Sequence, residues 1–153
     1  MDQYDSKAFP VKFLQSLYWN QYYELKQKGK EQAARKNGTV LSTVAIMANS
    51  SVLLGFLIFF FPDIGDGIMD LLEDAFGPRG GRTMGQILGA ILFASIYFVI
   101  HFTLGKPEKF DRMMESFLSL SEEEQLIASK QGLRYFMISL LLVALPLLQL
   151  VFS

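Results

Sequence analysis

The sequence predicts an all-α integral membrane protein with three transmembrane helices and short amphipathic surface helices. Two observations lead to this fold class. Hydrophobic residues make up 51% of the 153-residue chain, a few points above the usual share in a soluble domain. The charged residues are also segregated, because the runs 40–61, 84–104 and 135–152 contain no Asp, Glu, Lys or Arg.

Each uncharged run is long enough to cross a bilayer. At roughly 1.5 Å per residue the runs extend about 27 to 33 Å, which matches a hydrocarbon core of roughly 30 Å. Buried helices of a soluble protein are the alternative, but the remaining polar chain is too short to cover three such runs. We therefore divide the chain into a basic amphipathic segment (1–38), a first span (39–61), an acidic amphipathic connection (62–83), a second span (84–104), a helical connection (105–134) and a third span (135–153).

The distribution of Lys and Arg sets the expected orientation. Of the 14 basic residues, seven precede the first span, two lie in the first connection and five in the second. Positively charged segments resist translocation, so we expect the amino terminus and the second connection on the cytoplasmic side, or the matrix side of an organelle. A bacterial inner membrane and an organellar inner membrane both fit. The first 30 residues contain no signal-peptide core, and we expect an uncleaved terminus.

The segment from Pro10 to about Lys30 has the pattern of an amphipathic helix. Aromatic residues and leucines recur at helical spacing on one side, and lysines follow at its end. This pattern is typical of a helix that lies in the membrane interface, and it also fits docking on a partner protein. In the first case, the residues that contact lipid headgroups, anionic ones above all, are Trp19, Lys26, Lys28, Lys30, Arg35 and Lys36.

The connections between the spans contain clear turn and capping signals. Asn37-Gly38 predicts a bend, after which Thr39 caps the first transmembrane helix. Pro62 ends that helix, and a short acidic helix on the outer surface follows. The stretch 77–82 combines a proline with three glycines and predicts an irregular link.

The second connection contains start signals for two helices. Pro107 is suited to a first helical position. Ser121 followed by Glu124 matches a capping box, in which each residue satisfies a backbone N–H of the other. We expect the helix that begins there to run through Gly132 into the third span.

Two polar residues within the spans are candidates for function. Asn49 lies near the middle of the first span, where its amide must contact protein or trapped water. His101 is the only histidine. Metal sites need several His, Asp, Glu or Cys ligands, and the chain has no Cys. We therefore expect no metal and no cofactor apart from structural lipids, and we prefer a hydrogen-bonded His101 over a haem or chlorophyll ligand.

No catalytic residues are predicted. His101 and Ser139 lie at similar depths in different spans and could meet, but no carboxylate within the bilayer would orient such a pair. The other polar groups of the spans lie at different depths. A site that binds or transports a ligand needs its polar groups to converge, so this mismatch weakens that interpretation.

Small residues in the second span predict close helix packing. A GxxxG pair occupies one side of the helix and a pair of alanines another side, while the first span contains small residues that form a matching groove. Such residues let helix backbones approach closely, either within the chain or against another subunit. The six residues are Gly85, Gly89, Ala90 and Ala94 in the second span and Ser51 and Gly55 in the first.

These features favour a non-catalytic accessory subunit of a larger membrane complex, with an energy-transducing complex as one candidate host. Its partners would be other membrane subunits and anionic lipids, and no nucleic acid. Two alternatives remain open. One is a small oligomeric transporter or channel with Asn49 in its pore, and the other is a membrane-embedded enzyme or cofactor binder that uses His101.

Overall fold

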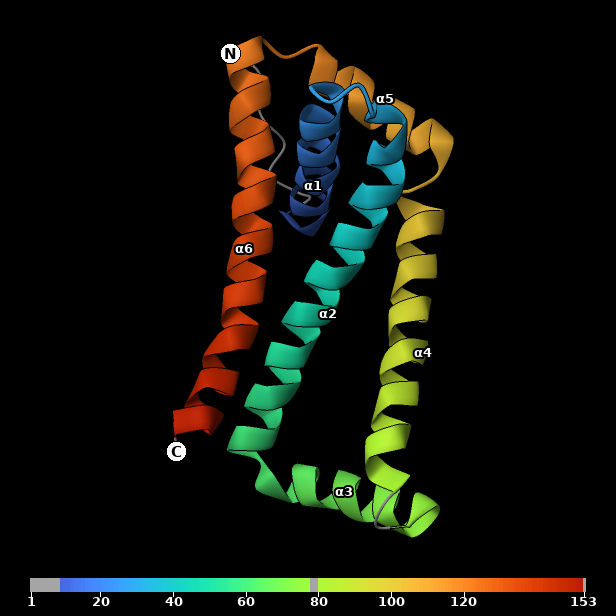
Figure 1. Ribbon diagram of the computed structural model, residues 1–153, viewed down its shortest axis with the longest axis vertical. Helices are drawn as coiled ribbons and strands as arrows, with labels where there is room; N and C mark the ends of the chain where they lie inside the picture. Colours follow the sequence, from blue (N-terminus) through green and yellow to red (C-terminus); the bar gives the residue numbers. More distant parts are fainter. Residues whose placement is uncertain (1–8, 78–79, 153) are drawn as a thin grey trace.

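The computed structural model describes residues 9–77 and 80–152 (Figure 1). Within these ranges every regular element is a helix, as the sequence predicts. In chain order the elements are α1 (Phe9–Lys26), the 3-10 helix η1 (Glu31–Ala33), α2 (Ala34–Phe60), α3 (Pro62–Phe76), α4 (Gly80–Thr103), α5 (Pro107–Leu118) and α6 (Glu122–Phe152).

Three segments are long and apolar enough to cross a membrane. They are Glu31–Phe60, which comprises η1 and α2, Thr83–Thr103 in α4 and Glu122–Ala144 in α6. Helices of this length cover a hydrocarbon core of roughly 30 Å. The chain is thus a multi-pass, all-helical membrane protein, and the predicted fold class is confirmed.

The long helices stand side by side, with α2 running diagonally between α6 and α4 (Figure 1). α5 lies across one end of the bundle, which we call the α5 end. α3 joins α2 to α4 across the opposite end, the α3 end. α1 stands between α2 and α6 at the α5 end and packs against both.

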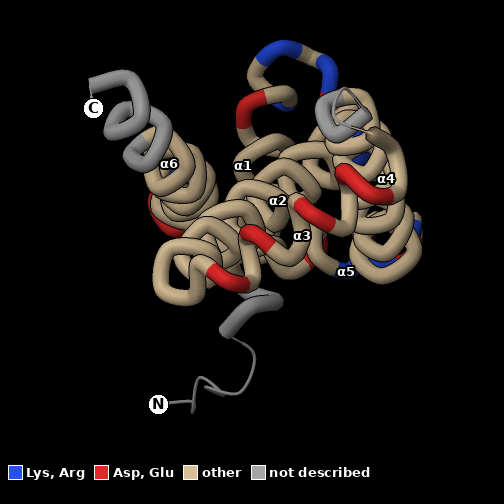
Figure 2. The backbone as a smooth tube through the Cα atoms, turned by 90° about the horizontal axis from the view of Figure 1, so that it is seen from below, with Lys and Arg blue, Asp and Glu red and all other residues tan. Residues whose placement is uncertain are grey.

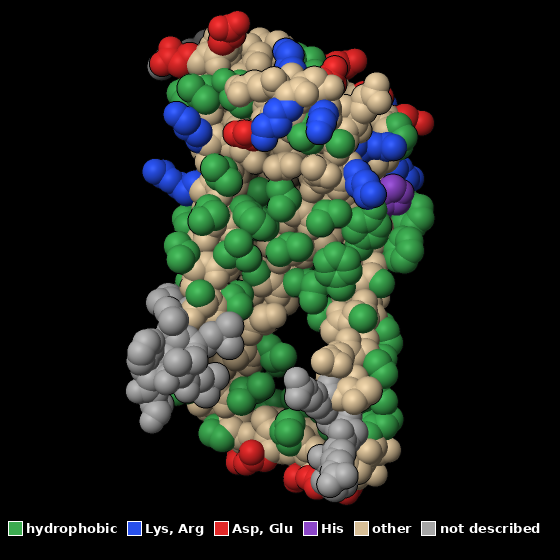
Figure 3. All heavy atoms as spheres, viewed as in Figure 1, with side chains coloured by type: hydrophobic (Ala, Val, Ile, Leu, Met, Phe, Trp, Pro, Cys, Tyr) green, Lys and Arg blue, Asp and Glu red, His purple; other side chains and the backbone are tan. Residues whose placement is uncertain are grey.

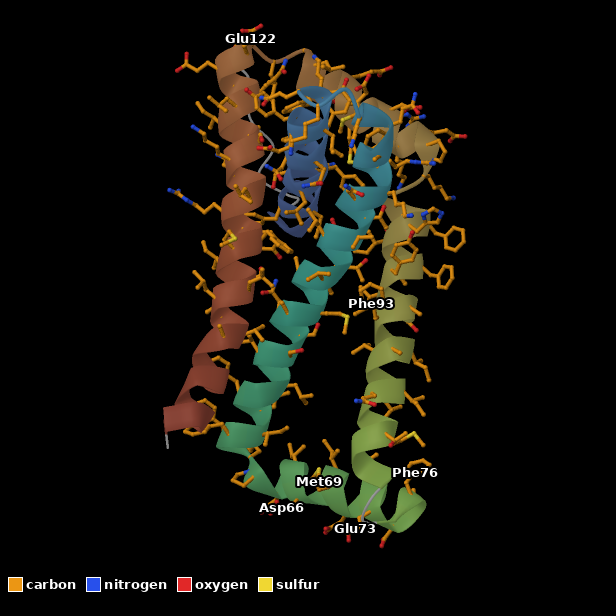
Figure 4. The ribbon with its side chains drawn as sticks, in the orientation of Figure 1. Asp66, Met69, Glu73, Phe76, Phe93 and Glu122 are labelled. Atoms are coloured by element: carbon orange, nitrogen blue, oxygen red, sulfur yellow. The ribbon has the colours of Figure 1, made fainter. Side chains whose placement is uncertain are left out.

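Charged side chains gather at the two ends, with a band of apolar side chains between them (Figure 3). The Lys and Arg side chains visible in that view lie at the α5 end. Acidic residues follow α3 across the other end, onto which Figure 2 looks. Asp66 and Glu73 project away from the bundle there, while Glu122 lies at the α5 end (Figure 4). This distribution is typical of a bundle whose middle lies in lipid.

The first transmembrane helix begins earlier than predicted. α2 continues through Asn37-Gly38 without a bend, so the predicted turn is wrong. Gly38 is instead the place where α1 approaches, because a Cβ on Gly38 would lie 2.8 Å from Cγ of Tyr18. Thr39 donates a hydrogen bond to Arg35 O, 3.0 Å away, within the helix rather than as its cap. A glycine that serves close packing therefore resembles a turn signal in the sequence.

The junctions around α3 are partly as predicted. Pro62 occupies the first turn of α3, where a proline sacrifices no hydrogen bond. Gly77 follows the helix with a φ of 72°, which glycine adopts without strain. The predicted irregular link is wrong for residues 80–82, which belong to α4, while residues 78–79 lie outside the described ranges. Glycine lowers helix propensity by about 1 kcal/mol without forbidding a helix, and the long apolar segment carries α4 back to Gly80.

The predicted capping box is present at the start of α6. Ser121 N donates to Glu124 Oε2 at 2.9 Å, and Glu124 N donates to Ser121 Oγ at 3.4 Å. The bond from the Ser121 backbone, followed by that from its hydroxyl, holds the pKa of Glu124 below its ordinary value. α6 then runs through Gly132 without interruption, which confirms the predicted continuous helix.

A hydrophobic core cluster lies at the α5 end. Tyr18 of α1 is fully buried there and meets Met113 and Met114 of α5. The apolar side of α5, along which methionines and phenylalanines recur at helical spacing, therefore covers α1. The partly buried residues around this cluster are Trp19, Tyr22, Leu104 and Phe110.

Candidate functional site

α1 occupies a seat formed by α2, α5 and α6, and two glycines make room for it. On α2, Gly38 lies against the ring of Tyr18. On α6, a Cβ at Gly132 would lie 3.0 Å from the backbone N of Leu17 and would overlap Ser16. Leu17 and Tyr18 have no exposed surface. Small residues allow such close approach between helices, and α1 is therefore an integral part of the bundle.

The position of α1 differs from the one expected from the sequence. Its aromatic side packs on the chain's own helices, neither flat in the membrane interface nor on a separate partner. Trp19 Nε1 donates to Met113 O at 3.0 Å, and the Trp19 ring stacks on Phe117 with the centroids 5.7 Å apart. Trp19 thus anchors α1 to α5, and its contact with lipid headgroups stays a prediction. The periodicity of a helix gives its buried side but not the surface that covers it.

The basic residues expected at the membrane surface lie at the α5 end. Lys26, Lys28, Lys30 and Lys36 are exposed, and Arg35 is partly buried. Their alkyl stems can cover apolar surface while the charged heads stay in the headgroup region. Contact between these residues and anionic lipid stays a prediction.

Hydrogen bonds tie α1 to both long helices. Tyr18 OH lies 3.0 Å from Thr39 Oγ1. Burial raises the pKa of Tyr18, and the bond to Thr39 partly opposes this shift. Asn20 Nδ2 donates to Ser129 Oγ on α6 at 3.2 Å, and Gln21 Nε2 donates to Asn20 Oδ1 at the same distance. Buried polar groups that are satisfied in this way fix the position of a helix.

One hydroxyl close to the seat lacks a partner. Ser42 on α2 has no exposed surface, and its Oγ has no hydrogen bond within the described part of the chain. The neighbouring Thr43 satisfies its own hydroxyl by donating to Thr39 O at 2.8 Å. An unsatisfied buried hydroxyl lowers stability, so Ser42 is a weak point of the packing.

Deeper in the bundle, Asn49 contacts protein, as its position in the first span predicts. Its Nδ2 donates to the hydroxyl of Tyr135 on α6 at 2.9 Å. The Tyr135 ring in turn stacks on Phe13 of α1, with the centroids 5.0 Å apart. Sequence reasoning did not single out Tyr135, because an aromatic residue at the start of a span is common for reasons of the interface alone.

His101 lies partly buried near the α5 end of α4, among aromatic rings. It stacks on Tyr97 with a centroid distance of 5.9 Å and meets Phe102 edge-on at 5.4 Å. Ser139 is buried on α6. α2 lies between α4 and α6 (Figure 1), so the structure does not bring His101 and Ser139 together. Among the residues that the structure describes, no group of three His, Cys, Asp or Glu side chains is placed to hold a metal ion.

The small residues of the second span do not pack within this chain. A Cβ at Gly85 or Gly89 on α4, or at Gly55 on α2, would meet no atom within 4 Å. Of the two alternatives, contact within the chain is not made at these positions, because α3 spans the α3 end and holds α2 and α4 apart (Figure 1). Contact of the glycine pair with another subunit stays a prediction. The remaining residues of this set, all exposed, are Ser51, Ala90 and Ala94.

The described residues form a tightly packed seat at the α5 end and an open α3 end, where apolar side chains are exposed beside the acidic residues of α3. The polar side chains at the seat bond to one another and join helices. Their arrangement fits a structural role for the seat. No family model, curated protein or solved structure matches this chain.

Proposed function

We propose that the chain is a non-catalytic accessory subunit of a larger membrane complex, in which it contributes helix packing and lipid contacts. The observation that carries this proposal is the exposure of α4. Only 6% of the most apolar window of Thr83–Thr103 is buried within the chain, against 17% for Glu31–Phe60 and 22% for Glu122–Ala144. The least buried transmembrane helix also carries the open glycine pair.

A glycine pair on an exposed transmembrane helix suits contact with another subunit. Helices in lipid gain little from hydrophobicity itself, so their association depends on close backbone approach. Each glycine within a helix costs up to about 1 kcal/mol relative to alanine. Within this chain no close helix contact at Gly85 or Gly89 offsets this loss of stability. Close contact with a helix of a partner subunit would offset it.

The α3 end offers further apolar surface to a partner. α3 has no buried residue, and its Met69 and Leu71 are 62% and 68% exposed. Phe59 and Phe60, at the end of α2, are 75% and 66% exposed. Figure 4 shows Phe93 of α4 projecting into the space between α4 and α2 above α3. Aromatic residues of this kind are enriched in the centres of protein interfaces.

The charge distribution supports an orientation with the α5 end on the cytoplasmic or matrix side. The exposed lysines of the α1–α2 connection lie at this end, while α3 presents acidic residues at the other. Basic segments are retained on the side of synthesis. We therefore propose a bacterial or organellar inner membrane, with anionic lipid around the basic residues.

The two alternative functions have less support. The amide of Asn49 donates to Tyr135 within one chain, which gives it a structural partner without a pore. The ring of His101 lies against Tyr97 and Phe102, and α2 separates it from Ser139. Flux through proteoliposomes that contain only this protein would favour the transporter instead.

The experiment that tests the proposal is purification of the tagged chain from its own membrane in a mild detergent, with identification of co-purifying proteins by mass spectrometry. The wild-type chain should elute with a fixed set of membrane proteins. Gly89→Leu should insert normally but elute without them, because its side chain blocks close approach. Leu92→Ala, three residues along the same helix, is the matched control and should keep them. If Gly89→Leu retains the full set, the glycine pair faces lipid and the main support for the proposal is lost.

A further inference from the structure

Two hollows lie one above the other along α2 and α6. The first, of about 440 Å³, is a groove between the two helices, lined by residues that include Val44 and Ser51 of α2 and Leu140 and Ala144 of α6. The second, of about 480 Å³, lies nearer the α5 end. Both volumes fall within the roughly 300–1,000 Å³ typical of small-molecule sites.

The two hollows share one face of the helix pair. Asn37 lines the second hollow and Val44 the groove, and a separation of seven residues returns a helix to within about 20° of the same direction, roughly 10 Å further along. On α6, Leu133 lines the second hollow and Leu140, also seven residues further along, lines the groove. The groove therefore continues the second hollow toward the middle of the membrane.

The chemistry changes sharply from one hollow to the other. The groove is lined by aliphatic side chains, alanines, a methionine and Ser51, and it lies within the apolar part of Glu31–Phe60. The second hollow, which we call the polar pocket, combines the amides of Asn20, Gln21 and Asn37 with the side chains of Glu24 and Lys28. An occupant of both hollows must therefore have a polar head and an apolar tail.

Glu24 and Lys28 give the polar pocket one negative and one positive group. Both are exposed, and within the described part of the chain neither forms an ion pair or a side-chain hydrogen bond. The basic surface around them attracts anionic lipid, but the pocket itself presents opposite charges side by side. Such a pair complements a headgroup that carries both a phosphate and an ammonium group.

The shape of the groove favours an acyl chain over a protein helix. A helix with its side chains is about 10–12 Å across and rises about 5.4 Å per turn. About one turn of such a helix therefore has the volume of the groove, about 440 Å³. An extended acyl chain is thin enough to lie along the groove. From these observations we propose that the α1–α2–α6 face binds one zwitterionic phospholipid. Its ammonium group lies at Glu24, its phosphate at Lys28 and the amide of Asn37, and one acyl chain between Val44 and Leu140.

Native mass spectrometry tests the headgroup preference. The chain is reconstituted in nanodiscs with equal amounts of phosphatidylethanolamine and phosphatidylglycerol, extracted in mild detergent, and its retained lipid is identified. One phosphatidylethanolamine per chain should be retained, with a preference of about fivefold, the scale of one partly exposed ion pair. Glu24→Lys should reverse the preference, while Glu31→Lys, which changes the net charge equally outside the pocket, should not. Equal retention of both lipids, or an equal effect of the two variants, would overturn the proposal.

A second pair of variants tests the groove. Ser51→Leu fills it from an exposed position and should abolish retention, whereas Ser50→Leu, the exposed neighbour that does not line the groove, should leave it intact. Equal effects of the two variants would show that no chain lies there. A purified complex in which a partner's helix occupies the groove would contradict the proposal as well. Its failure would leave the accessory role untouched, since that role depends on α4 on the other side of α2.

Discussion

The ring of Tyr18 lies so close to Gly38 that a Cβ on the glycine would come within 2.8 Å of the ring's Cγ. This contact fixes α1 on α2, and the hydrogen bond between Tyr18 and Thr39, one residue further along, reinforces it. α1 is thereby held upright in the bundle. The position of α1 at the α5 end thus depends on Gly38, which lies within the regular helix α2 and allows close packing rather than a turn.

Gly38→Ala should destabilise the isolated chain by about 1–3 kcal/mol, the usual cost of overpacking. The added methyl group must displace a fully buried ring. Gly89→Ala is the matched control, since its Cβ meets no atom and alanine favours the helix by up to about 1 kcal/mol. Unfolding of both variants in detergent, followed by circular dichroism, checks the difference. Equal stability of Gly38→Ala and the wild type would show that α1 is not held where the structure places it.

Deletion of two hydroxyls in and beside the seat should affect stability differently. Tyr18→Phe removes a buried hydrogen bond and should cost about 0.5–1.5 kcal/mol of unfolding free energy. Ser42→Ala removes a buried hydroxyl without a partner among the described residues, and it should leave the stability equal or higher. The same unfolding measurement serves both. A loss of stability in Ser42→Ala would mean that its hydroxyl has a partner, such as a buried water.

The capping box should give α6 a dependence on acidic pH. The pKa of Glu124 is lowered from 4.5, so the bonds to Ser121 stabilise the folded chain fully above that value. This contribution is lost as the pH falls through the lowered pKa, because the protonated carboxyl is a weaker acceptor. Glu124→Gln should therefore remove part of the pH dependence of unfolding below pH 4.5. A carboxyl titration followed by NMR should also show a higher midpoint in Ser121→Ala than in the wild type.

The sequence was sufficient for the elements whose signals are local. The uncharged runs gave the three spans, and Ser121 with Glu124 gave the start of α6, because both depend on composition or on neighbours three residues apart. The packing partners were not local. Gly38 and Gly132 both contact α1, although all three are far apart in the sequence. The sequence alone therefore does not show which helix packs against these glycines.

The same limit applies to the candidate site. The spacing of Gly85 and Gly89 predicts a helix side that can be approached closely, but not whether the approaching helix belongs to this chain or to another subunit. Likewise, the position of Asn49 predicted a protein contact, while the identity of Tyr135 depends on the crossing of α2 and α6. Residues far apart in the sequence meet only once the helices are placed.

Labelling of single cysteines should establish the orientation. The chain has no native cysteine, so each introduced thiol is unique. In intact cells or right-side-out vesicles, Gly67→Cys on α3 should react with an impermeant thiol reagent and Ser121→Cys should be protected. Both positions are exposed, and both should react after the membrane is permeabilised. The reverse pattern would place the α5 end outside and contradict the orientation argued from the lysines and arginines.

The bond between Asn49 and Tyr135 should couple α2 to α6 measurably. A double-mutant cycle with Asn49→Ala and Tyr135→Phe isolates it, because each change removes one partner of the 2.9 Å hydrogen bond. Hydrogen bonds between transmembrane helices are worth about 0.6 kcal/mol on average and at most about 1.7 kcal/mol, so the coupling energy should fall in that range. Stability is measured by unfolding of the isolated chain in detergent. If Asn49 lined the pore of an oligomer instead, Asn49→Ala would alter assembly and the cycle in the isolated chain would show no coupling.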